Sequence, residues 1–229
     1  MPKTALKFSV DATCLPLGHF EAALRSLADA GADEVFFVIS DGGSAPLTGA
    51  GPALVAAAGG LGLARHVHLI VAHPERHVDS FAAMKCERLT FQIEGCVHAH
   101  RVLGQIRAAG MSPGIALSPC TPLTKLDYVL ELADRVLLLG LEPGVMEGVA
   151  RGALLERVKL LDENIRYREL QTAIAVGGGL DVAAMAKAVR LGAKTVVADG
   201  NSGGWDSGAN PGIAMAALRE AVAAAVKTA

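Results

Sequence analysis

The four cysteines of this 229-residue chain form no Cys-x-x-Cys pair, so a disulfide framework and a paired redox site are not expected. No apolar run approaches the roughly 18 residues that a membrane-spanning helix needs. The first ten residues lack the long apolar segment of a signal peptide. Lys and Arg number 21 against 23 Asp and Glu, without a basic block that would attract nucleic acid. These absences predict a reduced, cytoplasmic protein that binds neither membranes nor nucleic acid.

Apolar residues, in contrast, are abundant. They make up 52% of the chain, and charged residues make up 19%. This proportion is enough to bury one substantial core, and we find no linker or low-complexity segment, so residues 1–229 are predicted to form a single domain. The sequence is compatible with a homo-oligomer but does not specify one.

The clearest local pattern lies in residues 114–144. An apolar run at 115–117 is followed by Thr121, a predicted helix N-cap, and Pro122, the predicted first helical residue. Leucine and valine then recur at helical spacing up to Leu132. Residues 135–139, RVLLL, are typical of a strand that is covered on both faces. The segment therefore predicts one strand–helix unit and the strand that follows it.

The same unit recurs along the chain. We predict strands at 5–10, 34–39, 66–71, 88–93, 115–117, 135–139, 172–176 and 195–198, alternating with eight helices. Gly31, Gly110 and Gly192 are expected to end helices in the left-handed conformation. This alternation predicts an α/β fold, a single (β/α)8 TIM barrel. The alternative is an open doubly wound sheet, but no G-x-G-x-x-G follows the first strand.

A family resemblance rests on several short motifs: His68-Leu69-Ile70-Val71 with Pro74-Glu75, Ser118-Pro119-Cys120-Thr121-Pro122, Glu142-Pro143-Gly144, and Gly178-Gly179. With these motifs the chain resembles the ribulose-phosphate 3-epimerase family over about residues 5 to 200. The resemblance implies a barrel that epimerises a ketose phosphate. In that family two carboxylates move the proton at C3, and a divalent metal, usually zinc, polarises the ketone.

The chain departs from the family at the residues that carry this chemistry. Strand two of the family reads H-x-D-x-M-D-G, and Phe36 and Val38 stand here at the positions of the histidine and the first aspartate. Strand seven of the family ends V-D-G-G, and Gly177 replaces that aspartate. Of four implied metal ligands only His68 remains, while a catalytic zinc needs about three. We therefore expect no metal and no other cofactor.

The resemblance also implies a phosphate site made of backbone N–H groups from glycines after strands seven and eight. Gly178 and Gly179 are kept, and the second pair is replaced by Asp199-Gly200, followed by Asn201. An aspartate beside a phosphate is repulsive unless it points away or is paired. We expect a small sugar or sugar phosphate as the ligand, contacted by Ser9, Gly144, Gly178, Gly179, Gly200 and Asn201.

Polar residues at the carboxyl ends of barrel strands face the site. By this rule the candidate catalytic residues are His68, Asp11, Asp41 and Glu94. Each also has a structural interpretation: His68 as a histidine hydrogen-bonded to Ser9 or Gln92, and the three acids as turn formers or rim contacts. Less favoured alternatives are a Schiff base on Lys7 and zinc at Cys96-x-His98-x-His100 or His66-x-His68.

Two functions follow. The first is a carbohydrate epimerase or isomerase that acts without the family's metal. The alternative is a catalytically inactive barrel that binds a sugar phosphate, either as a sensor or as the partner of an active relative.

Overall fold

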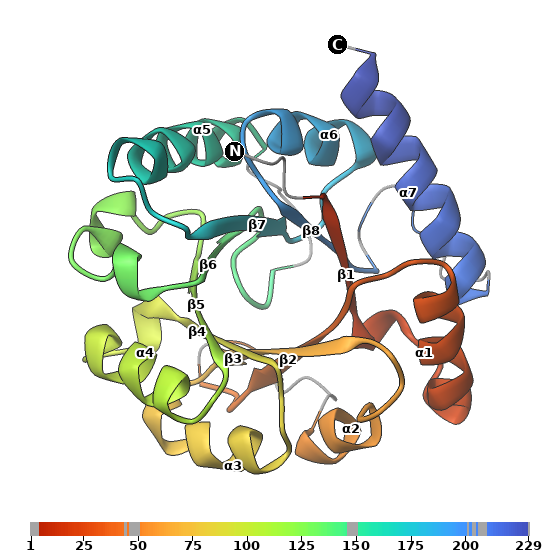
Figure 1. Ribbon diagram of the computed structural model, residues 1–229, viewed down its shortest axis with the longest axis horizontal. Coiled ribbons are helices and arrows are strands. Elements are labelled where there is room, and N and C mark those ends of the chain that lie inside the picture. Colours follow the sequence, from red (N-terminus) through yellow and green to blue (C-terminus); the bar gives the residue numbers. More distant parts are fainter. Residues whose placement is uncertain are drawn as a thin grey trace.

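The structure is a computed structural model that describes residues 5–43, 45, 51–145, 151–200, 202, 205 and 210–228. Eight parallel strands form a closed barrel in which each strand pairs with the next and the last pairs with the first. Figure 1 shows the strands at the centre and the helices around them. The predicted (β/α)8 barrel is confirmed. The strands are β1 (Lys7–Asp11), β2 (Glu34–Ser40), β3 (Ala64–Ile70), β4 (Arg88–Gln92), β5 (Ser112–Leu117), β6 (Arg135–Leu139), β7 (Ala173–Gly177) and β8 (Thr195–Ala198).

Seven α-helices lie among the described residues: α1 (Phe20–Asp29), α2 (Pro52–Ala57), α3 (Val78–Ala83), α4 (Ala99–Ala108), α5 (Arg151–Tyr167), α6 (Val182–Arg190) and α7 (Pro211–Lys227). Gly31, Gly110 and Gly192 have φ of 82°, 82° and 121°, which confirms the predicted left-handed positions after α1, α4 and α6. Within the described part of the chain, none of these helices combines the length and the apolar composition needed to cross a membrane.

The predicted fifth helix is wrong. Between β5 and β6 the chain forms two 3-10 helices, η5 (Leu123–Leu126) and η6 (Leu130–Leu132). Pro122 precedes the first of them in an extended conformation, with ψ of 145°. The helical spacing is still satisfied, because Leu126 and Leu130 are buried. Carbonyl groups that an α-helix would pair internally are bound from outside, since the Thr172 hydroxyl donates to Leu130 and Ala133.

Two other predicted boundaries differ. The helix expected over 75–84 is divided into η3 (Pro74–Arg76) and α3, with His77 between them. The helix expected from about Gly148 is α5, and residues 146–150 lie outside the described residues.

The core consists of two shells, because successive strand residues point to opposite faces. Outward-facing side chains such as Phe37, Leu69 and Phe91 pack against the helices and are fully buried. Inward-facing side chains form a small second cluster inside the barrel: Phe36, Ala116, Leu137, Ala175 and Val197.

A charged cluster closes the amino-terminal end of the barrel. Glu34, Arg88 and Arg135 are the first residues of β2, β4 and β6. Both Nη atoms of Arg135 donate to the Glu34 carboxylate, at 2.6 and 2.8 Å, and Arg88 Nε lies 2.8 Å from Glu34 Oε1. Burial lowers the pKa of neighbouring His66 to about 4. With this end sealed by ion pairs, the cavity of the barrel lies at the carboxyl end.

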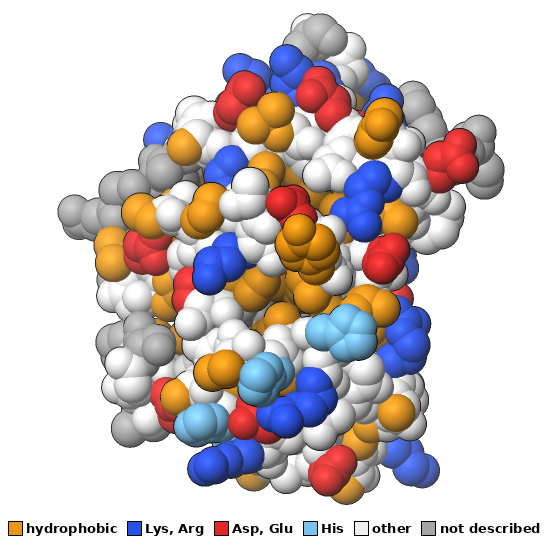
Figure 2. Space-filling model, turned by 90° about the vertical axis from the view of Figure 1, so that its left-hand side faces the viewer, with side chains coloured by type: hydrophobic (Ala, Val, Ile, Leu, Met, Phe, Trp, Pro, Cys, Tyr) orange, Lys and Arg blue, Asp and Glu red, His pale blue; other side chains and the backbone are white. Residues whose placement is uncertain are grey.

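The outer surface carries mixed charge. Figure 2 shows acidic and basic side chains interspersed over the face that lies on the left of Figure 1. Where the two signs alternate in this way, their fields largely cancel at a distance.

Candidate active site

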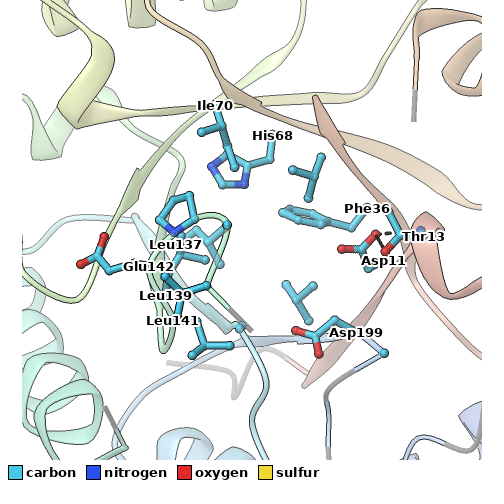
Figure 3. Close-up of a pocket in the computed structure, with 18 of the residues that line it drawn as sticks. Asp11, Thr13, Phe36, His68, Ile70, Leu137, Leu139, Leu141, Glu142 and Asp199 are labelled. Carbon is cyan, nitrogen blue, oxygen red and sulfur yellow. Dashed lines mark hydrogen bonds between the residues drawn. The ribbon is translucent and has the colours of Figure 1, made fainter. Parts of the chain in front are cut away.

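A cavity of about 420 Å³ opens at the carboxyl ends of the strands. Its wall is mostly hydrocarbon, and its polar side chains are few (Figure 3). The lining residues come from β1 to β3, β6 to β8 and the loops that follow them: Asp11, Thr13, Cys14, Phe36, Val38, His68, Ile70, Leu137, Leu139, Leu141, Glu142, Pro143, Gly144, Val145, Gly177, Gly178, Val197, Asp199 and Gly200.

The four positions at which the resemblance implies metal ligands all line this cavity. They hold Phe36, Val38, His68 and Gly177. The ring centroids of Phe36 and His68 lie 5.6 Å apart, so hydrocarbon occupies the space beside the one remaining imidazole. Among the residues that the structure describes, no group of three or more His, Cys, Asp or Glu side chains could hold a metal ion. This donor set does not fit a divalent metal, and the zinc spacings His66-x-His68 and Cys96-x-His98-x-His100 do not form a cluster either.

His68 reaches the cavity from β3, and a hydrogen-bond chain holds it in place. Its Nε2 lies 2.9 Å from Gln92 Oε1, and Gln92 Nε2 donates to Ser118 Oγ at 2.6 Å. An amide oxygen only accepts hydrogen bonds, so Nε2 carries the proton and Nδ1 is left as an acceptor. Burial lowers the pKa of His68 to about 4, which keeps the imidazole neutral near pH 7.

Asp11, the last residue of β1, presents a buried carboxyl group to the cavity. Its Oδ1 accepts hydrogen bonds from the backbone N and the hydroxyl of Thr13, each at 2.8 Å. Burial raises the pKa of Asp11 to about 6, and these bonds oppose the rise only in part. Figure 3 shows the carboxyl group turned into the cavity, near the ring of Phe36. A carboxyl group that titrates near neutral pH suits proton transfer.

The other two predicted catalytic acids lie outside this cavity. Asp41 is exposed and accepts from Gly43 N and Ala72 N, at 2.9 Å each, so it joins the loops after β2 and β3. Glu94 lines a smaller cavity of about 170 Å³ and accepts from Ser118 N at 3.0 Å and from the Thr121 hydroxyl. Thr121 therefore contacts a carboxylate instead of capping a helix.

The predicted ligand-contacting residues are divided as well. Gly144, Gly178 and Gly200 line the cavity. Ser9 is fully buried inside the barrel and does not line the cavity. The backbone N of Gly179 donates to Asp199 Oδ2 at 2.8 Å. Asn201 lies outside the described residues.

The sequence analysis did not identify the side chains that hold the carboxylates of Asp11 and Asp199 in place. Thr13 binds Asp11, and Ser202 Oγ lies 3.1 Å from Asp199 Oδ1. The signal was present, because Asp followed two or three residues later by Thr or Ser is typical of side-chain turns. Cys14 was also missed; burial raises its pKa to about 12, so the thiol stays protonated in the cavity wall.

The site combines an acidic rim with an apolar floor. Asp11 ends β1 and Asp199 follows the neighbouring strand β8, and the charge of Asp199 contributes to the raised pKa of Asp11. Figure 3 places both on one side of the cavity and Leu137, Leu139 and Leu141 on another. Glu142 points away from the centre, and its Oε1 accepts from Cys120 N at 3.1 Å.

Comparison with known sequences agrees with the resemblance. Residues 9–201 match the sequence model of the ribulose-phosphate 3 epimerase family. A protein named ribulose-phosphate 3-epimerase from Treponema pallidum (strain Nichols) is 34% identical over 178 residues, which cover 77% of this chain and 82% of that protein. A protein of the same name from Rhodobacter capsulatus is 29% identical over 226 residues, 97% and 98% of the two chains.

Solved structures share the fold. The structure described as "Native KDPGal structure" has a TM-score of 0.68 at 20% identity and covers 98% of both chains. A tryptophan synthase structure from Mycobacterium tuberculosis has a TM-score of 0.65 at 19% identity, with 99% of this chain and 94% of that chain covered. At these identities the likeness extends to the barrel alone.

Proposed function

The chain belongs to the ribulose-phosphate 3-epimerase family, and we propose that its barrel mouth binds a small sugar or sugar phosphate and isomerises it by proton transfer without a metal. Two features support the absence of a metal step. The cavity offers His68 without two further ligands near it, and Phe36, Val38 and Gly177 occupy the other implied positions. The chemistry must then come from the chain's own acids and hydrogen-bond partners.

The observation that carries the proposal is the state of Asp11. Its carboxyl group is buried at the cavity wall, and its pKa is raised to about 6. Oδ1 is held by Thr13, which leaves Oδ2 for a ligand. As a carboxylate, Asp11 takes the proton from the hydroxyl-bearing carbon beside the carbonyl group, and that carbon's hydroxyl group passes its proton to the carbonyl oxygen, which leaves an enediolate. As a carboxylic acid, Asp11 then returns its proton to the former carbonyl carbon, and the negatively charged oxygen becomes the new carbonyl group.

The position of Asp11 opposite an apolar wall favours proton transfer on one face of the ligand. Inversion at a single carbon needs acid–base groups on both faces, but the wall contributed by β2 and β6 consists of apolar side chains: Phe36, Val38, Leu137 and Leu139. A single base can move a proton between adjacent carbons on the same face. The geometry therefore supports an aldose–ketose isomerisation better than an epimerisation. His68 Nδ1, an acceptor, would hold a ligand hydroxyl in place.

A second candidate is an inactive barrel that binds its ligand without turnover. It is favoured by the neutral state of His68, which lacks a proton on Nδ1 to stabilise an enediolate. In this case Asp11 serves to order the turn through Thr13.

We also propose a reduced, cytoplasmic setting for the protein. All four cysteines are free in the structure, which suits that setting.

Proton exchange with solvent separates the two candidates. The protein is incubated with pentoses, pentuloses, hexuloses and their phosphates in deuterated buffer, and deuterium at carbon is measured by NMR. Isomerisation predicts exchange above the blank that Asp11→Asn lowers at least about a hundredfold, within the usual range for a general base. Asp79→Asn, the same change on the exposed face of α3, serves as the control. Ligand-dependent thermal stabilisation without exchange would identify the inactive binder.

A further inference from the structure

The turn after β7 has the geometry of an anion site. Gly178 and Gly179 both adopt positive φ, of 90° and 68°, and lead into α6. Backbone N–H groups of successive residues in such a turn point into one concave surface, and the nearby helix N-terminus favours negative charge. Gly178 lines the main cavity, so an anionic group of a bound ligand would be placed here.

A side chain of the protein itself already binds this turn. Asp199, the residue after β8, accepts a hydrogen bond from Gly179 N at its Oδ2, 2.8 Å away. Its other oxygen lies 3.1 Å from Ser202 Oγ, and the same hydroxyl accepts from Asp199 N at 3.0 Å. Both carboxylate oxygens are therefore held, and the carboxylate takes the place that a ligand anion would occupy.

We propose that Asp199 is a specificity-determining residue that fills the anion site, so that the barrel mouth selects unphosphorylated carbohydrates. The inference rests on the proposed carbohydrate function and narrows its substrate class. A phosphate group would have to break the bond between Asp199 and Gly179 and then lie beside two carboxylates, Asp199 and Asp11. In a partly buried cavity like charges repel far more strongly than in water, which disfavours phosphorylated ligands.

The proposal is tested by titrating the full chain with inorganic phosphate, ribulose 5-phosphate and ribulose in a calorimeter. Asp199→Ser removes the carboxylate and exposes Gly179 N. Asp199→Asn keeps an acceptor for that N–H while it removes the charge. Glu142→Gln is the matched control, since it removes one rim charge whose carboxylate binds Cys120 N instead of the glycine turn.

We expect the native chain to bind inorganic phosphate no better than millimolar. Asp199→Ser should gain affinity for phosphate and ribulose 5-phosphate by at least about tenfold, which corresponds to about 1.4 kcal/mol of binding free energy. Asp199→Asn should show a smaller gain, and this variant alone decides the outcome if the serine variant does not fold. Equal phosphate affinity in the native chain and both variants would overturn the proposal. An equal gain of phosphate affinity in Glu142→Gln would also overturn the proposal, because the loss of one negative charge anywhere on the rim would then explain the gain.

The two proposals fail separately. Asp11-dependent exchange of ribulose 5-phosphate by the native chain would support the proposed function and refute the role of Asp199. A gain of phosphate binding in Asp199→Ser, with no carbohydrate exchanged by any form, would support the role of Asp199 and refute the isomerase.

Discussion

The imidazole of His68 and the amide of Gln92 are hydrogen-bonded across neighbouring strands, with 2.9 Å between Nε2 and Oε1. This bond decides what the histidine can do. It places the proton on Nε2 and leaves Nδ1 as an acceptor. Gln92 also donates to Ser118, the residue that follows β5, so a bond from β4 and a contact beyond β5 together fix the orientation of the ring.

Replacing Gln92 with glutamate should change the charge state of this histidine. A carboxylate at the same distance stabilises the imidazolium, so the pKa of His68 should rise from about 4 to near or above its ordinary value of 6.5. The titration is followed by NMR of the imidazole resonances. Gln105→Glu on the exposed side of α4 adds the same charge far from the ring and should leave the pKa unchanged. A His68 that still titrates near 4 in Gln92→Glu would contradict the hydrogen bond between His68 and Gln92.

The raised pKa of Asp11 predicts that the folded chain becomes less stable as pH rises. Its pKa is about 6 in the folded chain, against 3.8 as the ordinary value. Between these values the folded state binds more protons than the unfolded state, so the free energy of unfolding falls as pH rises from about 4 to 6. A shift of about two pKa units corresponds to roughly 3 kcal/mol at most.

Urea unfolding at several pH values between 4 and 7 measures this effect. The native chain should lose more stability across that window than Asp11→Asn, which has no carboxyl group to titrate there. Parallel pH profiles for the two proteins would show that Asp11 titrates normally.

Glu34 should be far more important for stability than an exposed acid. In Glu34→Gln the guanidinium groups of Arg88 and Arg135 lose their shared carboxylate, and a buried charge left without its partner costs about 3–5 kcal/mol. Glu21→Gln breaks only the exposed pair with Arg25 and should cost less than about 1 kcal/mol. Thermal and urea unfolding of both variants provide the comparison, and similar losses would contradict the buried ion-pair cluster.

The contribution of Glu34 to the free energy of unfolding changes with pH in the opposite direction to that of Asp11. Burial tends to raise its pKa, but the bonds and charges of His66 and Arg135 outweigh burial and lower it. The stabilisation is present above the ordinary glutamate pKa and is lost as the carboxylate is protonated in strong acid.

A metal site should be recoverable at the implied positions. Phe36→His, Val38→Asp and Gly177→Asp would surround His68 with three further ligands. A Cβ atom at Gly177 would approach Val197 Cβ to 3.0 Å, and only glycine at position 197 removes that Cβ, so Val197→Gly is included to make room. The combined variant should bind Zn²⁺ in calorimetry, and replacing His68 with Ala in that background should weaken binding. Failure to bind zinc in a folded variant would mean that these positions do not converge.

The barrel could be predicted from the sequence because most strands are short segments rich in apolar residues and Gly31, Gly110 and Gly192 mark helix ends. The fifth connection could not be predicted, because the 3-10 form depends on Thr172, which is distant in sequence and binds its carbonyl groups. Local spacing alone does not distinguish it from an α-helix.

For the candidate catalytic side chains, the sequence predicted cavity positions only inside the strands. His68 and Asp11 obey the alternation of strand residues, and both line the cavity. Asp41 and Glu94 come after the last residues of β2 and β4, where alternation no longer determines direction, and backbone amides hold them outside the cavity. The hydrogen bond between Gly179 N and Asp199 could not be predicted either. It forms because β7 and β8 pair side by side, which brings together two residues that are 20 positions apart in the sequence.

The central claim, metal-free proton transfer by Asp11, is tested most directly by deuterium exchange measured with and without zinc. The native chain and Asp11→Asn are assayed with ribose, ribulose and their phosphates in deuterated buffer, once with excess chelator and once with added Zn²⁺. We predict carbon-bound deuterium in the unphosphorylated sugars of the native samples, at equal rates under both conditions, and none above the blank in Asp11→Asn. Exchange that requires Zn²⁺, or that persists in Asp11→Asn, would contradict metal-free proton transfer by this carboxyl group.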